Sequence, residues 1–159
     1  MKKFDIAIIG GGILGTTISY WISNLYDSSV CVIEKESNVA KHTSGRNTGV
    51  VHTPFYLNPE KKRIFAKSAH ISHDLWKTLA KNTMSPWDEI GTIEVALDEI
   101  QYKTLQKYQK WGIQNGVSEN NLSLLDSNEL KEKEKNIECH SGLLCKTDVC
   151  TDYSKLTRE

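Results

Sequence analysis

The sequence predicts an α/β fold that opens with a strand, a helix and a second, parallel strand. An apolar, β-branched run over residues 4–9 predicts the first strand, which would be buried on both faces if it is the central strand of a parallel sheet. Apolar residues at helical spacing follow over residues 13–25 and end at the turn residues 27–29. A second β-branched run over residues 30–34 ends in an acid, so residues 4–34 form one βαβ unit.

The middle of the chain is predicted from turn signals and spacing. Residues 40–58 form a long polar loop rich in glycine, proline and asparagine, a composition typical of functional loops. Pro59 begins an amphipathic helix that ends near residue 82. A strand is then expected over residues 91–97.

The last third of the chain alternates helical and strand signals. Asp98 is expected to cap a helix that ends within residues 112–116. Residues 126–138 predict a charged helical region, and residues 142–145 a short strand. Asp152 is expected to cap a final short helix.

Composition excludes several classes of protein. The chain has 159 residues with 20 Lys and Arg against 20 Asp and Glu, so it has no long-range attraction to nucleic acid or anionic lipid. Glycines and hydroxyl residues interrupt the uncharged stretch 6–26, which therefore predicts neither a signal peptide nor a membrane span. The four cysteines lack paired spacing, which predicts free thiols in the cytoplasm and no metal site.

A glycine-rich turn joins the first strand to the first helix and has the G-x-G-x-x-G pattern of dinucleotide-binding turns. Gly10 permits a tight turn, Gly12 lets the backbone approach a pyrophosphate, and Gly15 lets the helix pack on the sheet. The helix N-terminus offers N–H groups and its positive dipole end to the phosphates. The predicted phosphate-binding residues are Gly10, Gly12, Ile13, Leu14 and Gly15.

An acidic residue ends the second strand at the position expected for ribose recognition. Glu34 follows Gly15 by 19 residues, and its carboxylate can accept hydrogen bonds from ribose hydroxyls. The same charge would repel a 2′-phosphate, so NADP is disfavoured. Lys35 is grouped with Glu34 as a predicted nucleotide-binding residue. A glycine-rich turn without a nucleotide stays open as the alternative.

The loop after the second strand, residues 42–52, reads HTSGRNTGVVH. It resembles a motif of D-amino-acid-oxidase-like FAD-dependent oxidoreductases, the H-x-T/S-G-x-N-S-G-V-x-H loop of the L-2-hydroxyglutarate oxidase/dehydrogenase branch. Three positions depart from the motif of that branch. Arg46 occupies a position where the branch commonly has histidine, and Thr48 one where it usually has serine. Thr53-Pro54 replace a small residue followed by glycine. Weaker matches occur in residues 91–96, 126–134 and 142–153.

The resemblance implies a Rossmann-like FAD-binding domain with part of an α+β substrate domain, and FAD as cofactor. It implies oxidation of a small 2-hydroxy acid, in which flavin accepts a hydride while a base takes the hydroxyl proton. L-2-hydroxyglutarate, oxidised to 2-oxoglutarate, is the first expected substrate, with oxygen or a quinone as electron acceptor. The alternatives are a flavin amine oxidase, a glycerol-phosphate dehydrogenase, or a non-catalytic nucleotide-binding fragment.

The resemblance also assigns residues of the loop to the flavin. Asn47, Thr48 and Gly49 would donate to the flavin or pyrophosphate, with an ordinary Asx turn as the alternative. Arg46 would reach a phosphate or a substrate carboxylate, unless it is a surface arginine. The predicted cofactor-binding residues of the loop are Ser44, Arg46, Asn47, Thr48, Gly49 and Val50.

Two histidines bound this loop. His52 is the candidate catalytic residue beside the flavin ring, because a histidine titrates near neutrality, and a structural histidine is the alternative. His42 is expected to orient the loop. The basic residues at positions 61–67 predict a solvated helix face, with attraction of a dicarboxylate as the second interpretation.

Three segments are expected along the chain. Residues 1–82 are the N-terminal part of the FAD-binding domain, residues 83–147 part of the substrate domain, and residues 148–159 the start of a return to the FAD-binding domain. Only two parallel strands are predicted, fewer than a nucleotide-binding half uses. We therefore expect the sequence to be the N-terminal part of a longer enzyme.

Overall fold

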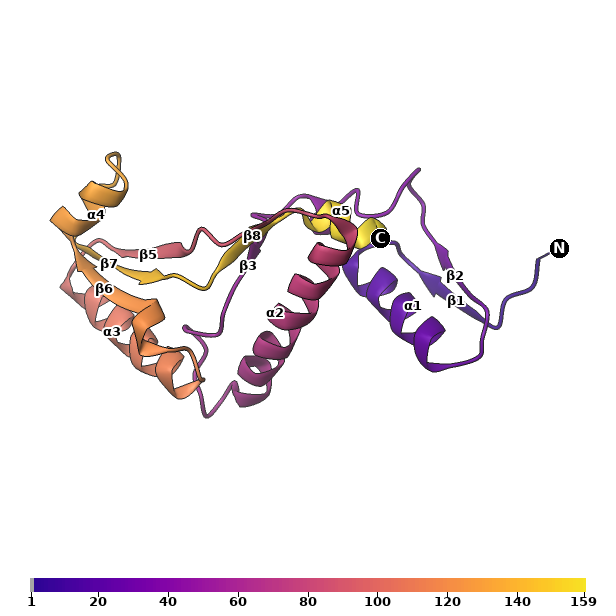
Figure 1. Ribbon diagram of the computed structural model, residues 1–159, viewed down its shortest axis with the longest axis horizontal. Helices are drawn as coiled ribbons and strands as arrows, with labels where there is room; N and C mark the ends of the chain where they lie inside the picture. Colours follow the sequence, from indigo (N-terminus) through magenta and orange to yellow (C-terminus); the bar gives the residue numbers. More distant parts are fainter. Residues whose placement is uncertain (1) are drawn as a thin grey trace. The chain divides into compact units, whose positions relative to one another are not determined.

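The computed structural model describes residues 2–159, which fold as two compact units; Figure 1 gives the order of the elements. Unit 1 consists of residues 2–49, Leu79–Pro86 and Thr151–Glu159. Unit 2 consists of Val50–Thr78 and Trp87–Cys150. Helices and strands alternate in both units, so the α/β class predicted from the sequence is confirmed.

Unit 1 contains the predicted βαβ unit, formed by β1 (Ile6–Ile9), α1 (Ile13–Leu25) and β2 (Val30–Ile33). The two strands are parallel, with Ile6 opposite Val30 and Ile9 opposite Ile33. Burial of the first strand on both faces was expected only for a central strand, and within residues 2–159 β1 pairs with β2 alone. Alternate residues of β1 are exposed, Ile9 by 87%, so one face of the strand is uncovered within residues 2–159.

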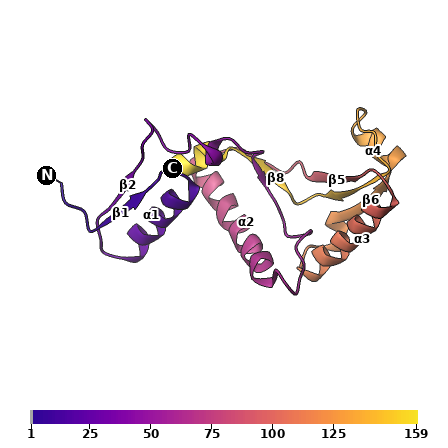
Figure 2. The same cartoon turned by 180° about the vertical axis from the view of Figure 1, so that it is seen from behind.

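The rest of unit 1 includes a short 3-10 helix, η1 (Thr43–Gly45), and the C-terminal helix α5 (Tyr153–Arg158). Asp152 caps α5 as predicted, because its side chain accepts from the Lys155 N–H at 3.0 Å. Both α1 and η1 contact α5, and α5 lies beside the start of α1 in Figures 1 and 2. The end of the chain thus packs beside the predicted nucleotide-binding turn.

Unit 2 is built on an antiparallel sheet in the order β5-β7-β6, formed by β5 (Thr92–Ala96), β7 (Ser141–Cys145) and β6 (Leu122–Asp126). Helix α3 (Glu99–Gln114) packs along one face of this sheet (Figure 2). Apolar side chains between them form the core. The buried core residues are Phe55, Ala96, Leu105, Val117, Leu122, Leu143 and Cys145.

A glycine sets how closely α3 approaches this core. A Cβ atom on Gly112 would lie 2.9 Å from Cβ of Phe55 and 2.5 Å from Cδ1 of Leu122. The predicted cap of this helix is confirmed, since the Asp98 carboxylate accepts from the Gln101 N–H at 2.8 Å. Together the cap and the glycine fix the position of α3 on the sheet.

Two predicted helices have other bounds in the structure. Helix α2 covers Arg63–Thr83 rather than beginning at Pro59, because Asn58 Oδ1 accepts from the amides of Glu60 and Lys61 and forms a turn there. The charged region 126–138 contains only α4 (Ser127–Lys133), which begins with a capping box between Asp126 and Glu129. No helix within residues 2–159 is long and apolar enough to cross a membrane.

A second small sheet contains the last part of the loop at residues 42–52. Its order is β3-β8-β4, formed by β3 (Val50–Val51), β8 (Val149–Thr151) and β4 (Trp87–Asp88). β3 and β8 are antiparallel, with Val51 opposite Val149. This pairing brings the residues after Val51 close to the turn before Val149.

Candidate functional site

The glycine-rich turn of unit 1 has a backbone that needs glycine at two of its positions. Gly10 has φ +104°, in the region that side chains rarely adopt. A Cβ atom on Gly15 would overlap the carbonyl oxygen of Gly10. Gly12 is different, because a Cβ there would meet only the Ser44 hydroxyl, at 3.2 Å. Glycine is therefore needed at Gly10 for its backbone conformation and at Gly15 for its close approach to the Gly10 carbonyl, whereas a Cβ at Gly12 would meet only a side-chain hydroxyl.

The N-terminus of α1 has backbone donors to offer. Gly12 is the N-cap residue, with no side-chain cap and no acid in the first turn. The Ile13 N–H donates to Oγ of Ser44 at 2.9 Å. Within residues 2–159 no protein acceptor faces the amides of Gly12 or Leu14. Two N–H groups and the positive end of the helix dipole are thus available to an anion, which fits a pyrophosphate.

The Glu34 carboxylate is held at the end of β2 by backbone donors. Its oxygens accept from the amide of Gly11 at 2.5 Å and from the amide of Glu36 at 3.0 Å. These hydrogen bonds, from Glu36 first and then Gly11, hold the pKa of Glu34 below its usual value. The carboxylate is ionised at neutral pH and keeps lone pairs that can accept from ribose hydroxyls. Lys35 extends into solvent, with Nζ 3.7 Å from Oε1 of Glu36.

The loop that follows is stabilised by its own side chains. Asn47 donates to the carbonyls of Thr43 and Ser44 at 3.1 and 3.0 Å, and its Oδ1 accepts from the Gly49 N–H at 2.8 Å. Its amide therefore has both donors and its acceptor engaged within the loop. His42 Nε2 lies 2.9 Å from Glu36 Oε1, and this hydrogen bond holds the pKa of Glu36 below its usual value.

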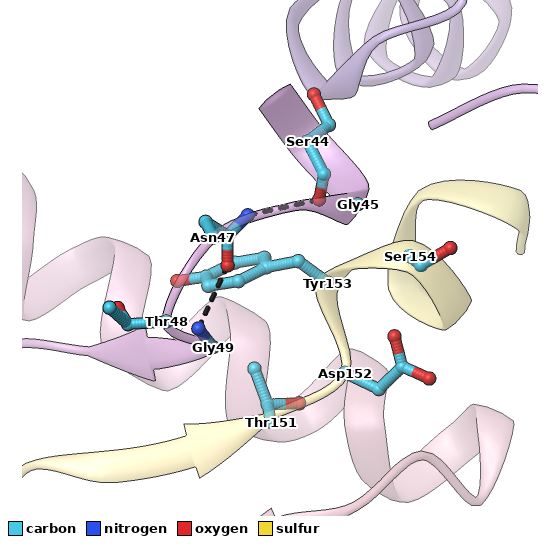
Figure 3. A pocket seen from close by; sticks show the side chains of 9 residues that line it. All are labelled: Ser44, Gly45, Asn47, Thr48, Gly49, Thr151, Asp152, Tyr153 and Ser154. Atoms are coloured by element: carbon cyan, nitrogen blue, oxygen red, sulfur yellow. Dashed lines mark hydrogen bonds between the residues drawn. The ribbon is translucent and has the colours of Figure 1, made fainter. Parts of the chain in front are cut away.

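A pocket of unit 1 opens between this loop and the start of α5 (Figure 3). The Thr151 N–H donates to the Gly49 carbonyl at 2.8 Å and joins the two segments. The walls are polar, with hydroxyl, amide and carboxylate groups. The lining residues are Ser44, Gly45, Asn47, Thr48, Gly49, Thr151, Asp152, Tyr153 and Ser154. Small residues and polar groups in the walls suit the polar parts of a dinucleotide.

A second cluster lies in unit 2, around His52. Nδ1 of His52 is 2.7 Å from Oδ2 of Asp148, whose side chain is fully buried, whereas 41% of the His52 side chain is exposed. Tyr56 packs edge-on against the imidazole, with ring centroids 5.7 Å apart. The hydrogen bond to Asp148 raises the pKa of His52 against the opposing effect of burial.

Asp148 is surrounded by hydrogen-bond donors. Its Oδ1 accepts from the Thr53 N–H at 2.7 Å and from the Thr53 hydroxyl at 2.8 Å. Its Oδ2 accepts from the Thr92 hydroxyl at 2.7 Å, beside His52. Burial would raise the pKa of Asp148, but hydrogen bonds from His52, Thr53 and Thr92 outweigh it and lower that pKa below its usual value.

Asp148 was not predicted from the sequence, and neither was its contact with His52. It lies 96 positions from His52 and has no motif of its own. The one signal was an isolated acid between the two apolar strands at residues 141–145 and 149–151. Aspartate is mostly exposed in proteins and is fully buried almost only when it is paired, so this signal alone does not predict the cluster.

The structure brings most of the predicted cofactor residues into unit 1. These are Gly10, Gly12, Ile13, Leu14, Gly15, Glu34, Lys35, Ser44, Arg46, Asn47, Thr48 and Gly49. Val50 and His52 belong to unit 2, where Val50 pairs with Cys150. Arg46 is exposed, and no acid in the described chain pairs with it. All four cysteines are free, and residues 2–159 contain no group of three metal-ligating side chains.

Known proteins resemble this chain along nearly all of its length. The glycerol 3-phosphate dehydrogenase of Caloramator mitchellensis is 34% identical over 136 residues, covering 84% of this chain and 27% of that protein. The mitochondrial L-2-hydroxyglutarate dehydrogenase of Homo sapiens is 30% identical over 164 residues, covering 97% of this chain and 34% of that protein. The chain thus spans about a third of the length of the curated relatives it matches.

A solved structure and a family model agree with these relatives. The dithionite-reduced L-α-glycerophosphate oxidase of Mycoplasma pneumoniae, solved with FAD bound, superimposes with a TM-score of 0.83 at 28% identity. The match covers 99% of this chain and 41% of that one. The model of the family described as "DAO: FAD dependent oxidoreductase" matches residues 5–159. The chain therefore belongs to the DAO family of FAD-dependent oxidoreductases, and FAD is the cofactor of that family.

Proposed function

We propose that unit 1 holds the dinucleotide of FAD, with its pyrophosphate at the N-terminus of α1. The observation that supports this most strongly is the pair of amides of Gly12 and Leu14, which no protein acceptor faces in the described residues. Gly12 leaves space for close approach, and Ser44 provides a hydroxyl beside it. The ionised carboxylate of Glu34 is suited to the ribose of the adenosine half.

We assign the loop residues different parts in this site. Asn47 shapes the loop, because its hydrogen-bonding groups are already engaged with Thr43, Ser44 and Gly49. Thr48, which lines the pocket, is the loop hydroxyl proposed to contact the cofactor. Arg46 has an exposed guanidinium that suits a phosphate or carboxylate oxygen. Ile13, Gly15, Lys35 and Val50 are retained as neighbouring cofactor residues.

The proposed reaction is oxidation of the carbon that bears a hydroxyl group in a small 2-hydroxy acid. When bound, FAD supplies the acceptor for the hydride and its electron pair. His52 is proposed to accept the hydroxyl proton, since a histidine titrates near neutrality and 41% of this side chain is exposed. L-2-hydroxyglutarate is the first substrate, and similarity to a dehydrogenase of that acid along 97% of the chain supports it.

Glycerol 3-phosphate is a second candidate substrate, supported by another relative of the chain. The relative from Caloramator, at 34% identity, is a glycerol 3-phosphate dehydrogenase. Glycerol 3-phosphate also has a hydroxyl-bearing carbon next to an anionic arm, so the same proton and hydride transfer would serve it. We keep glycerol 3-phosphate as the alternative to the 2-hydroxy acid.

The domain organisation, electron acceptor and location of the protein are proposed as well. Residues 1–82 and 148–159 would contribute to the FAD-binding domain and residues 83–147 to the substrate domain. Oxygen or a quinone would accept the electrons, and the protein would work in the cytoplasm.

The experiment is an anaerobic substrate panel on the protein loaded with FAD. L-2-hydroxyglutarate, glycerol 3-phosphate, glycine and sarcosine are added separately, and loss of visible flavin absorbance is followed. Bleaching by L-2-hydroxyglutarate alone supports the first proposal, and bleaching by glycerol 3-phosphate alone selects the alternative. Bleaching by an amine contradicts both. Bound FAD that no substrate reduces would identify a non-catalytic nucleotide-binding segment.

A further inference from the structure

The environment of Asp148 requires a charged carboxylate. The groups that face it within 2.8 Å are the Thr53 amide and hydroxyl, the Thr92 hydroxyl and Nδ1 of His52. The two hydroxyls can turn their protons toward it, and the amide can only donate. Each carboxyl oxygen accepts from two of these groups, so protonation of one oxygen would force a hydroxyl or the imidazole to change from donor to acceptor. The ionised form satisfies all of them without leaving the buried site.

An ionised Asp148 in turn fixes the protonation of one ring nitrogen of His52. A carboxylate only accepts hydrogen bonds, so Nδ1 at 2.7 Å must carry a proton. In the neutral imidazole the lone pair is therefore on Nε2. Tyr56, packed edge-on at 5.7 Å, restricts the rotation of the ring around this bond. The histidine is held in one tautomer and one orientation.

The other charged group near this pair acts in the same direction. Glu94 on β5 also raises the pKa of His52, though less than Asp148 does. Tyr56 is neutral at physiological pH because burial raises its pKa further. The groups facing His52 from the strands and turns around it are Asp148, Glu94 and Tyr56. The pH response of His52 therefore depends mainly on Asp148.

We infer that Asp148 is a positioning residue, which holds His52 with its proton on Nδ1 and its Nε2 lone pair ready to accept the substrate's hydroxyl proton. This inference rests on the proposed oxidoreductase function. In the reaction the substrate O–H bond breaks and its proton goes to Nε2 of His52. The C–H bond breaks with its electron pair leaving as hydride to the flavin, so the alcohol becomes a ketone. Asp148 stays ionised throughout.

The first test reads the tautomer of His52 in the unaltered protein. Nitrogen NMR of the 15N-labelled full chain distinguishes a protonated from an unprotonated ring nitrogen, and His52→Gln identifies the signals. We expect Nδ1 of neutral His52 to be protonated and Nε2 to be unprotonated. A neutral His52 with its proton on Nε2 overturns the inference. This measurement needs neither FAD nor substrate, so its outcome is separate from that of the proposed function.

The second test changes the carboxylate. In Asp148→Asn we expect the titration midpoint of His52 to move to lower pH, because the charge that stabilises the imidazolium is lost. Thr92→Val is the matched control, since it removes another hydrogen bond to Oδ2 without removing the charge. A midpoint that moves equally in both variants, or in neither, contradicts the assignment. If Asp148→Asn does not fold, the tautomer of the unaltered protein decides.

The third test separates positioning from structural support. With the FAD-loaded protein, Asp148→Asn should lower the rate of flavin reduction by up to about 10⁴-fold, since replacing the aspartate that orients a catalytic histidine by asparagine has an effect of that size. The rise of that rate with pH should also move to lower pH, following the His52 midpoint. Thr92→Val should keep the original pH profile. An unchanged profile in Asp148→Asn, with reduction still measurable, would falsify the positioning role.

Discussion

Nδ1 of His52 and Oδ2 of Asp148 lie 2.7 Å apart, although the residues are separated by 96 positions in the sequence. The contact joins the segment after β3 to the turn before β8, next to the pairing of Val51 with Val149. One residue is exposed and the other fully buried, so the pair connects the interior of unit 2 with solvent. Proton uptake at the surface is thereby coupled to the stability of a buried hydrogen-bond cluster.

The stability of the protein should depend on pH through this pair. The pKa of His52 is raised in the folded state, so its stabilising contribution is complete below the unfolded value of 6.5. It is lost as the pH rises through the folded pKa. Asp148 has a lowered pKa, so its contribution exists above the unfolded value of 3.8 and is lost as the pH falls through the folded pKa.

Urea unfolding at a series of pH values measures this dependence. We expect the free energy of unfolding to fall as the pH rises above 6.5, and His52→Gln to remove much of that fall. His140→Gln is a suitable control, because His140 lies in the same unit and its side chain is 43% exposed, close to the 41% of His52. A fall of the same size in His52→Gln would show that His52 does not cause it.

Ser44→Ala should destabilise unit 1 although the substitution lies outside any long helix. Its hydroxyl accepts from the Ile13 N–H at 2.9 Å and so caps α1 from 31 positions away. Loss of a capping oxygen costs about 1 kcal/mol. Ser37→Ala removes an exposed hydroxyl nearby and should change the stability by less than about 0.5 kcal/mol. Thermal unfolding of the two variants tests this, and equal stability would contradict the capping role.

Alanine at two glycines of the turn should have opposite effects on folding and binding. Gly15→Ala brings a Cβ onto the Gly10 carbonyl oxygen and should destabilise the fold by about 1–3 kcal/mol. Gly12 has φ −79°, so Gly12→Ala should still fold, with a small shift of the Ser44 hydroxyl 3.2 Å from the new Cβ. It should bind FAD more weakly, since the methyl group lies at the proposed pyrophosphate position. Circular dichroism and FAD titration distinguish the two, and normal FAD affinity in Gly12→Ala would contradict the proposed phosphate contact.

The core of unit 2 offers a test that is independent of any cofactor. Leu143 on β7 is fully buried between α3 and the sheet, and Leu143→Ala should cost about 2–5 kcal/mol. Ile100 on α3 is 78% exposed, and Ile100→Ala should change stability by no more than about 0.5 kcal/mol. Urea unfolding compares the pair. Similar costs at both positions would contradict the burial that the fold assigns to them.

Helices and turns whose hydrogen bonds lie within a few residues could be predicted from the sequence. The spacing of apolar residues predicted α1 with its bounds, Ile13–Leu25. Asp98 and Asp152 predicted the starts of α3 and α5, because a cap is a hydrogen bond to residues only three positions away. The glycine pattern predicted where the first strand turns into the first helix.

Elements that depend on distant partners were missed. β4 (Trp87–Asp88) and β8 (Val149–Thr151) are too short to show a period of two, and pairing with strands far along the chain creates them. β6 (Leu122–Asp126) was not predicted, because its apolar and polar residues do not alternate regularly. The Asp148 cluster was missed for the same reason, since its partners are 56 and 96 positions away.

The central claim is that unit 1 of this chain binds FAD at the N-terminus of α1, and a titration tests it directly. The purified protein is titrated with FAD and, separately, with NAD, and bound flavin is read from its absorbance and fluorescence. Gly12→Asp places a negative charge at the proposed pyrophosphate position, and Ser37→Asp places the same charge on an exposed loop as the control. We expect saturable FAD binding in the unaltered protein and in Ser37→Asp, and none in Gly12→Asp. Binding of NAD in place of FAD, or equal FAD affinity in both variants, would contradict the account.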